Sequence, residues 1–137
     1  MTPAEAGRLV ESLGAAFGAA DVEAVMSLFA AEGDILYAGS EAGEVAGDRA
    51  ALRVMLAELF RREERYSWRC HGVHVTSCAA GVAVLAEATL FVDPTLPSGQ
   101  RSGAREAVPY RVSGLLEELH GAWRWRWCHG SEPVEAA

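Results

Sequence analysis

The sequence predicts an α+β fold, in which three N-terminal helices pack on a curved antiparallel sheet and enclose a cone-shaped cavity with it. Hydrophobic residues recur about every 3.6 positions in the N-terminal half of the chain and every second position in the C-terminal half. Helices gathered on one side of an antiparallel sheet are a common α+β arrangement. The alternating segment 121–131 places Trp123, Trp125 and Trp127 on one strand face, so this strand is expected in a core or along a cavity.

The composition fits one globular domain, expected over residues 1–131, with a short acidic tail over residues 132–137. The chain has 137 residues, of which half are hydrophobic. Its formal net charge of −7 opposes binding to polyanions, so no nucleic-acid partner is expected. No stretch approaches the roughly 20 apolar residues of a membrane span, and the N-terminus lacks a signal-peptide pattern. We therefore expect a cytoplasmic protein with no membrane partner.

The three cysteines, Cys70, Cys78 and Cys128, are an odd number without paired spacing, so free thiols are expected. Cys70 and Cys128 each precede a histidine, but neighbouring residues on a strand point to opposite faces, so no metal site is expected. The sequence contains no phosphate loop and no nucleophile elbow. We expect no cofactor.

Three helix starts are visible in the N-terminal half. Thr2 and Glu5 form a capping-box pattern that predicts a helix over residues 3–19. Asp21 is placed to cap a second helix, and Asp48 a third.

The second helix is expected to end at Gly33. A short strand over residues 35–37 and a loop over residues 39–47, rich in Gly and Glu, follow it. Four long strands come after the third helix and are expected to pair in sequence as a meander, over residues 66–77, 82–92, 105–119 and 122–130. Residues 93–103 form the longest connection between them.

Several segments resemble the SnoaL-like families of the nuclear transport factor 2-like superfamily. Asp21–Ala30 is similar to the second helix of these families, and Gly47–Leu52 is similar to the entry of the third. Gly121–Trp125 and His129–Ser131 resemble the family's Gly-x-Trp hairpin and terminal His-x-Ser. The resemblance implies a cystatin-like, cone-shaped fold with a ligand-sized pocket. Because the superfamily includes isomerases, cyclases, dehydratases, transport factors and oligomerisation hubs, it implies no single activity.

Inward-pointing polar groups would orient a ligand in such a pocket. The candidate catalytic residues are His129 and Glu87. The alternative for His129 is a core histidine hydrogen-bonded to Ser131 or to a backbone group, and the alternative for Glu87 is a side chain that faces outward. The candidate pocket residues are aromatic or basic: Tyr37, Trp68, Tyr110, Arg111, Trp125 and Trp127.

The register of the last hairpin decides whether Tyr110 or Arg111 faces the pocket. A two-residue turn at His120-Gly121 would place Tyr110 on the face of Trp125, Trp127 and His129. A loop one residue longer or shorter would place Arg111 there instead. The first register gives the more apolar inner face, and we prefer it.

Both faces of the strand at residues 82–92 are nearly apolar, which predicts a homodimer through the face that the helices do not cover. One functional hypothesis is a cofactor-independent isomerase, cyclase or dehydratase that acts on an apolar, oxygenated small molecule. In it His129 or Glu87 accepts a proton, and Tyr110 or Tyr37 donates a hydrogen bond to an enolate oxygen. The alternative is a non-catalytic dimerisation or ligand-binding module, in which the tryptophans would fill the cavity themselves.

Overall fold

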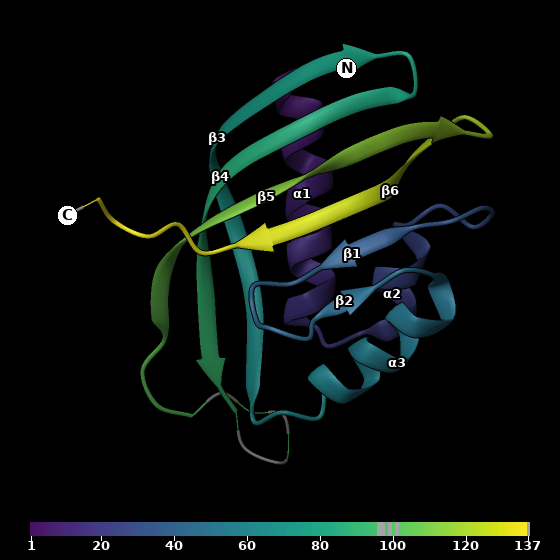
Figure 1. Cartoon of the computed structure of the whole chain (residues 1–137). Coiled ribbons are helices and arrows are strands. Elements are labelled where there is room, and N and C mark those ends of the chain that lie inside the picture. Colours follow the sequence, from purple (N-terminus) through teal and green to yellow (C-terminus); the bar gives the residue numbers. More distant parts are fainter. Residues whose placement is uncertain (96–97, 99, 101, 137) are drawn as a thin grey trace.

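The computed structural model describes residues 1–95, 98, 100 and 102–136. Figure 1 shows the helices and strands in the order that the sequence predicts, with one additional short strand. Part of the expected connection over residues 93–103 lies outside the described residues. The elements are α1 (Pro3–Gly18), α2 (Val22–Ser27), β1 (Leu36–Ala38), β2 (Val45–Ala46), α3 (Arg49–Leu59), β3 (Glu64–Cys78), β4 (Gly81–Pro94), β5 (Glu106–Leu119) and β6 (Ala122–Ser131).

The strands form one mixed sheet in the order β2-β1-β6-β5-β4-β3. Strands β3 to β6 are the predicted antiparallel meander. Strand β1 pairs with β6 in parallel, which an antiparallel prediction does not include. Parallel neighbours need a long connection, and here β2, α3 and β3 to β5 lie between the two strands in the chain. Strand β2 lies within the segment expected as a loop, because two residues are too few to show an alternating pattern.

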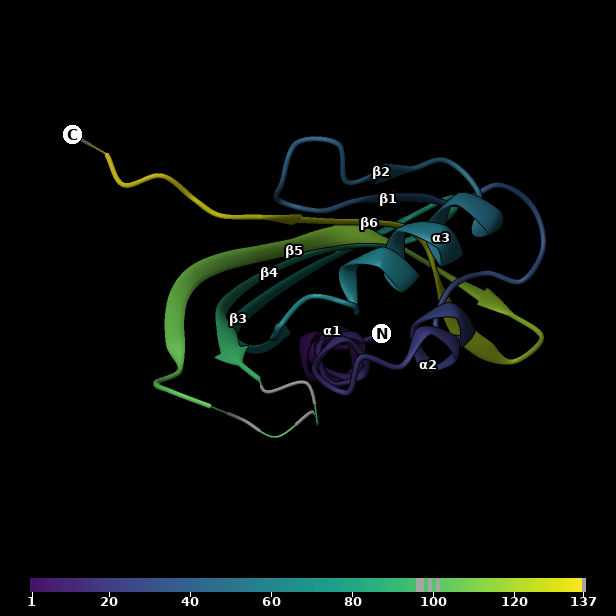
Figure 2. The same ribbon diagram turned by 90° about the horizontal axis from the view of Figure 1, so that it is seen from below.

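The helices lie on one side of the curved sheet, as Figure 2 shows. The predicted capping box of α1 is confirmed: the Thr2 side chain accepts a hydrogen bond from the Glu5 amide, and Glu5 accepts one from the Thr2 amide. Asp21 and Asp48 cap α2 and α3 as predicted. No helix in the described part of the chain is long and apolar enough to cross a membrane.

Helix α2 ends at Ser27, earlier than the expected end at Gly33. The Arg49 guanidinium reaches this end and donates hydrogen bonds to the carbonyl oxygens of Met26 and Ala30, at 3.2 and 2.9 Å. The carbonyl of Met26 also accepts a hydrogen bond from the Phe29 amide, and Ala30 follows the end of the helix. A side chain from α3 therefore binds the segment in which α2 ends.

The hairpin between β5 and β6 has the predicted two-residue turn, because Leu119 pairs with Ala122. His120 and Gly121 both have positive φ, of 52° and 79°, as a tight hairpin turn of this kind requires. The preferred register is confirmed near the turn, where Trp125 pairs with Leu116 and both are buried.

Beyond Trp125 the register changes. Trp127 pairs with Leu115, so Arg126 is an extra residue that forms a β-bulge. One extra residue moves every following side chain to the opposite face. The prediction that Trp127 and His129 share the inner face with Trp125 is therefore wrong: Trp127 is 39% exposed on the outer face, and Cys128 is buried in its place.

Arg126 has strong partners in this position. Its Nη1 donates hydrogen bonds to the carbonyl oxygens of Glu32 and Asp34, at 2.7 and 2.8 Å. Its Nε and Nη2 bind the Glu117 carboxylate, each at 2.7 Å. The bulge thus joins β6 to β5 and to the segment that leads into β1.

Candidate functional site

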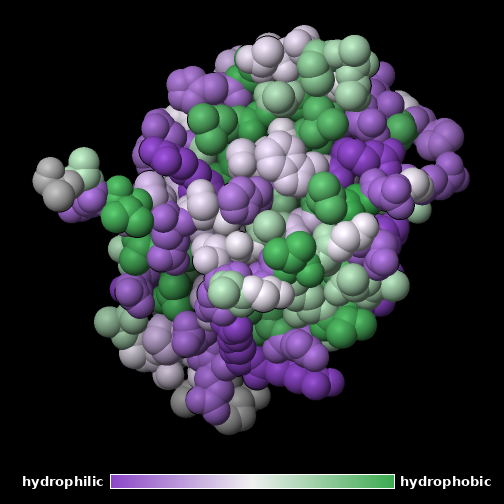
Figure 3. Space-filling model, viewed as in Figure 1, coloured by the Kyte–Doolittle hydropathy of each residue, from purple (hydrophilic) through white to green (hydrophobic). Residues whose placement is uncertain are grey.

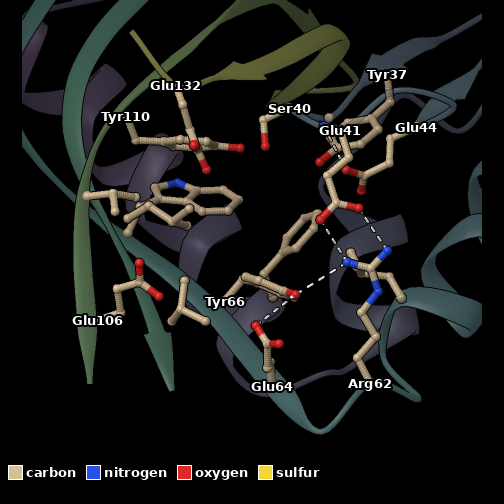
Figure 4. A pocket seen from close by; sticks show the side chains of 17 residues that line it. Tyr37, Ser40, Glu41, Glu44, Arg62, Glu64, Tyr66, Glu106, Tyr110 and Glu132 are labelled. Carbon is tan, nitrogen blue, oxygen red and sulfur yellow. Dashed lines mark hydrogen bonds and ion pairs between the residues drawn. The ribbon is translucent and has the colours of Figure 1, made fainter. Parts of the chain in front are cut away.

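A cavity of about 290 Å³ lies between the inner face of the sheet and the helices. Its walls come from α1, the β1–β2 connection, the end of α3, strands β3 to β5 and the residue after β6. Figure 4 shows that the labelled polar side chains surround one opening. The lining residues divide into an aromatic and aliphatic floor (Phe17, Tyr37, Leu59, Trp68, Leu90, Val92, Val108, Tyr110) and a polar mouth (Gly39, Ser40, Glu41, Glu44, Arg62, Glu64, Tyr66, Glu106, Glu132).

Aromatic rings in mutual contact build the floor. The ring of Trp68 lies 5.0 Å from that of Phe17 and 5.6 Å from that of Tyr110, measured between centroids. Phe17 also stacks on Tyr37 at 6.1 Å. Such pairs contribute beyond the area they bury, so these rings hold one another in place.

Trp68 is also fixed by its polar atom. Its indole Nε1 donates a 2.8 Å hydrogen bond to the carbonyl oxygen of Val10 in α1. A Cβ at Gly14 would lie only 2.9 Å from the indole ring, so the helix can approach the ring this closely because residue 14 is glycine. The Trp68 nitrogen is therefore occupied, and the cavity receives the apolar part of the ring.

The Tyr110 hydroxyl lies over a backbone position that has no side chain. A Cβ at Gly130 would collide with the hydroxyl oxygen, so the glycine on β6 makes room for it. A side-chain hydrogen bond with Ser40 lowers the pKa of Tyr110. Burial raises the pKa of Tyr110 well above its ordinary value, and the nearby groups Cys128, Glu44 and Glu132 raise it further. The hydroxyl stays protonated.

The Tyr37 hydroxyl faces the same cavity from β1, and only 4% of the residue is exposed. Burial raises the pKa of Tyr37 well above 10.0, with further contributions from Tyr110, Cys128 and Glu44. Within the described residues this hydroxyl makes no hydrogen bond. The hydroxyl opens onto the cavity, where a ligand can reach it. Tyr37 is therefore a donor available to a ligand.

Glu44 is the carboxylate next to these two hydroxyls. Its charge contributes to the raised pKa values of both Tyr37 and Tyr110. Partial burial raises the pKa of Glu44 itself above 4.5, and the neighbouring Glu41 charge adds to this. The Glu41 amide donates a 3.0 Å hydrogen bond to one oxygen of Glu44, which holds the side chain at the mouth. A carboxylate with a raised pKa is a better proton acceptor than an exposed one.

At the mouth, Arg62 links the α3–β3 connection, in which it lies, to the β1–β2 connection, which contains Glu41. It binds Glu41 through two hydrogen bonds of 3.0 and 2.9 Å and reaches the Tyr66 hydroxyl at 3.3 Å. Tyr66 in turn donates to Glu64 at 3.2 Å. The hydrogen bonds from Arg62 lower the pKa of Glu41, and those to Glu41 and Tyr66 raise the pKa of Arg62. Both terminal nitrogens of the guanidinium are therefore bound by the protein.

The lining residues limit the chemistry. All 12 basic residues of the chain are arginines, so no lysine can form a Schiff base. No histidine or cysteine lines the cavity, and the described residues contain no group of three side chains arranged to hold a metal. Carboxylates and tyrosine hydroxyls are the groups that can move protons or donate hydrogen bonds here.

Three of the residues expected in the pocket from the sequence line this cavity: Tyr37, Trp68 and Tyr110. Trp125 is 1% exposed and belongs to the core instead of the cavity wall. Its indole nitrogen has no hydrogen-bond partner within the described structure. The expectation that the tryptophans fill the cavity also differs from the structure, because Trp125 lies outside it and Trp127 lies on the outer face.

The other expected site residues lie on the outer face. Glu87 pairs across the sheet with Arg111, and both are exposed. His129 follows the bulge and lies opposite Ser113, on the same face as Trp127. The expectation that Glu87, Arg111, Trp127 and His129 reach the cavity is thus corrected: the strand alternation turns the first two outward, and the bulge at Arg126 turns out the last two.

The residues that sequence reasoning missed come mainly from the β1–β2 connection. Ser40, Glu41 and Glu44 lie in a segment whose Gly and Glu content indicates only a loop. One signal was present: a loop dense in carboxylates that directly follows the inward-pointing Tyr37 is a candidate pocket edge. Nothing in the sequence connects this loop to Arg62.

Solved structures with low sequence identity share this fold. A dehydratase candidate of the NTF2-like family from Streptomyces avermitilis is 16% identical, with a TM-score of 0.78 over 98% of this chain and 100% of that chain. ActVI-ORFA from Streptomyces coelicolor is 14% identical, with a TM-score of 0.73 over 94% and 95% of the two chains. A ketosteroid isomerase-like protein from Erwinia carotovora atroseptica is 18% identical, with a TM-score of 0.66 over 96% and 94%.

The family itself is identified from the sequence. A search among curated proteins found no match. The model of the SnoaL-like domain matches residues 8–135, which is nearly the whole chain. The segments that resemble this family in the sequence, the order of the elements and the similar solved structures all agree with that match. The chain belongs to the SnoaL-like domain family.

Proposed function

We propose that the cavity binds a small, mainly apolar, oxygenated molecule and transfers a proton within it without a cofactor, as an isomerase, cyclase or dehydratase does. The observation that carries this proposal is the meeting of two buried tyrosine hydroxyls with one carboxylate of raised pKa over an aromatic floor. A pair of titratable groups with different environments supports separate donor and acceptor roles.

The tyrosines would stabilise negative charge on a ligand oxygen. Because burial keeps Tyr37 and Tyr110 protonated, both can donate a hydrogen bond to an oxygen that becomes an enolate. The free hydroxyl of Tyr37 is the better placed, since Tyr110 already interacts with Ser40. Donors that are fixed before the reaction need no reorganisation when charge develops.

Glu44 would accept the proton from the α-carbon, which lies next to the carbonyl group that carries this oxygen, and return it at a second position. It replaces His129 and Glu87, the acceptors expected from the sequence, because it lines the cavity. Among the similar structures, one is named as a dehydratase candidate and another as ketosteroid isomerase-like. Proton removal beside a carbonyl is a step that such reactions share, which supports this class and specifies no substrate.

The test is deuterium uptake at the α-carbon of small apolar ketones in D₂O, followed by proton NMR. We expect the protein to accelerate uptake for ketones that fit the cavity. Glu44→Gln keeps the shape but removes the acceptor, so the rate should fall by about 100-fold or more. Tyr37→Phe should lower it by about tenfold to 100-fold, because one oxyanion donor is lost.

Glu87→Gln is the matched control, because it makes the same chemical change on the outer face. It should leave the rate unchanged, and so should His129→Gln. If Glu87→Gln or His129→Gln stops exchange while Glu44→Gln does not, the assignment of the acceptor is wrong. If no ketone of suitable size binds or exchanges, the ligand class is wrong.

We further propose that two copies associate through the outer face of the sheet. Leu36, Val45, Leu85 and Trp127 come from four different strands and are 54%, 71%, 43% and 39% exposed. Figure 3 shows this face, where apolar and weakly polar side chains cover much of the sheet. Exposed apolar residues that continue across strands are typical of an interface.

The charges on this face suit a second copy of the same chain. Glu87 and Arg111 are cross-strand neighbours, but they form no ion pair within the described structure. In a two-fold arrangement, each residue of such a pair can meet the opposite charge of the partner subunit. This face therefore fits a homodimer.

A further inference from the structure

We infer that Arg62 is a positioning residue for the proton acceptor of this cavity. By binding Glu41, it holds the β1–β2 connection in the shape that keeps the Glu44 carboxylate at the cavity. The inference rests on the proposed function only for the role of Glu44 as the acceptor. Arg62 acts through Glu41 and has no step of the reaction of its own.

The β1–β2 connection lies at an edge of the sheet. Strand β2 is the outermost strand and has two residues, so it pairs with β1 over a short stretch. Within the connection, the Gly39 amide donates to the Glu44 carbonyl oxygen at 2.8 Å, and the Glu44 amide donates to the Glu41 carbonyl oxygen at 3.2 Å. These local bonds shape the turn but do not attach it to the helices. A contact from outside the connection can therefore decide how it lies over the cavity.

Arg62 supplies such a contact from the α3–β3 connection. Its two terminal nitrogens bind the two carboxylate oxygens of Glu41, at 3.0 and 2.9 Å (Figure 4). Two parallel hydrogen bonds fix the direction of a carboxylate as well as its distance. The side chains of Arg62 and Glu41 are 42% and 53% exposed, and an exposed ion pair contributes little to stability. Its main effect is therefore the orientation of the connection.

Glu41 passes this constraint to Glu44 through its backbone. The Glu41 amide donates a 3.0 Å hydrogen bond to Oε1 of Glu44. The same carboxylate lies against Gly39, where a Cβ would come within 2.9 Å of the carboxyl carbon and of Oε2. The Glu44 side chain thus fits between a residue that Arg62 holds and a glycine that leaves room for it. If Arg62 released Glu41, the amide that orients Glu44 would be free to move.

The pKa of Glu44 reports where its carboxylate lies. Burial raises this pKa above 4.5, the Glu41 amide lowers it, the Glu41 charge raises it, and the Arg62 charge lowers it. Loss of the Arg62 charge alone would therefore raise the pKa, whereas release of the carboxylate into water would lower it toward 4.5. The other titratable groups that line the cavity are the same in both cases: Tyr37 from β1, Glu64 and Tyr66 from β3, Glu106 and Tyr110 from β5, and Glu132 after β6.

Two substitutions separate position from charge. Arg62→Lys keeps the charge but cannot form two parallel bonds with Glu41, and Arg62→Gln removes both the charge and these bonds. Carbon-13 NMR between about pH 3 and pH 8 gives the pKa of Glu44, whose carboxyl signal is the one that Glu44→Gln lacks. We expect this pKa to fall toward 4.5 in both Arg62 variants. We also expect kcat for deuterium uptake by the ketones to fall by about tenfold, with KM changed by less than about twofold.

The matched controls are Arg53→Lys and Arg53→Gln. Arg53 lies on α3 and forms an exposed ion pair with Glu23 of α2, and neither residue lines the cavity. Both control variants should keep the Glu44 pKa and the exchange rate of the wild type. Circular dichroism checks that all variants fold. If Arg62→Gln does not fold, Arg62→Lys decides alone.

The outcomes separate the inference from the proposed function. A Glu44 pKa that rises in Arg62→Gln, or that is unchanged in Arg62→Lys, would show that Arg62 acts through its charge alone, and the inference would be wrong. Exchange at the wild-type rate in both Arg62 variants would also overturn it and leave the proposed function intact. If the wild type catalyses no exchange, the proposed function fails, and the pKa of Glu44 still decides whether Arg62 holds this carboxylate.

Discussion

Gly130 determines where the Tyr110 hydroxyl can lie, because a Cβ at this position would occupy the space of the oxygen. We predict that Gly130→Ala displaces Tyr110, lowers the free energy of unfolding by about 1–3 kcal/mol and weakens binding of apolar ligands. Gly47→Ala is the matched control, since a Cβ there meets nothing within 4 Å. Urea denaturation and titration calorimetry measure both effects. Equal stability and affinity of the two variants would contradict this account.

Glu44 should make stability depend on pH. Its folded-state pKa is raised above 4.5 by burial, so the folded state binds its proton more tightly than the unfolded state does. The stabilising effect of the protonated group is fully present below about pH 4.5 and is lost as the pH rises through the folded-state pKa. Glu44→Gln removes this loss, so its advantage in stability over the wild type should grow with pH across that window.

Urea denaturation of both proteins between about pH 2.5 and pH 8 measures this difference. Glu41→Gln is the control, because the pKa of Glu41 is shifted in the opposite direction to that of Glu44. Arg62 lowers the pKa of Glu41, so the stability that Glu41 contributes is present above pH 4.5 and is lost as the pH falls through its folded-state pKa. A difference between Glu44→Gln and the wild type that does not vary with pH would show that burial does not perturb this carboxylate.

Single residues also show how far the sequence leads to the site. Tyr37, Trp68 and Tyr110 were expected in the pocket because each has a polar group that could orient a ligand among apolar walls. Glu44 was missed because it lies in a loop, where a carboxylate is ordinary. Its raised pKa comes from neighbours that the fold brings together, and no local pattern in the sequence records them.

At the scale of the elements, the bulge in β6 depends on one side chain. We predict that Arg126→Met lowers the free energy of unfolding by about 2–3 kcal/mol, because it removes an ion pair to Glu117 and two hydrogen bonds to backbone carbonyls. Arg124→Met is the matched control, since the hydrogen bond of Arg124 goes to the carbonyl oxygen of its neighbour Trp123. Thermal or urea denaturation gives both values. A larger loss for Arg124→Met would contradict the role of Arg126.

The same bulge explains why one part of the hairpin was predicted and the next was not. The turn at His120-Gly121 fixes the pairing as far as Trp125, because a two-residue loop leaves one register. The extra residue at Arg126 has no signal in an alternating sequence, since the pattern continues through it. Its partners, Glu32 and Asp34, lie 92 or more positions earlier in the chain. Only the assembled sheet shows that His129 faces outward.

At the scale of the whole molecule, the cavity is built from segments that are distant in sequence. Ser40 and Glu44 come from the β1–β2 connection, Arg62 comes from the α3–β3 connection, and Glu132 directly follows β6. Figures 1 and 2 show how the curvature of the sheet brings these segments together over the helices. The sequence predicts the elements and most of their order, because each has local signals. It does not predict the mouth of the cavity, which no single element contains.

The proposed dimer can be tested by a substitution at Trp127. Trp127→Glu places a charge in the apolar outer face, and burying it against a second copy would be costly. We therefore expect the wild type to sediment as a dimer of 14.6 kDa subunits and the variant as a monomer. Val54→Glu is the matched control, because Val54 is 61% exposed on α3, on the other side of the sheet. Analytical ultracentrifugation over a range of concentrations distinguishes these states. A monomeric wild type, or a Trp127→Glu variant that remains a dimer, would show that this face is not the interface.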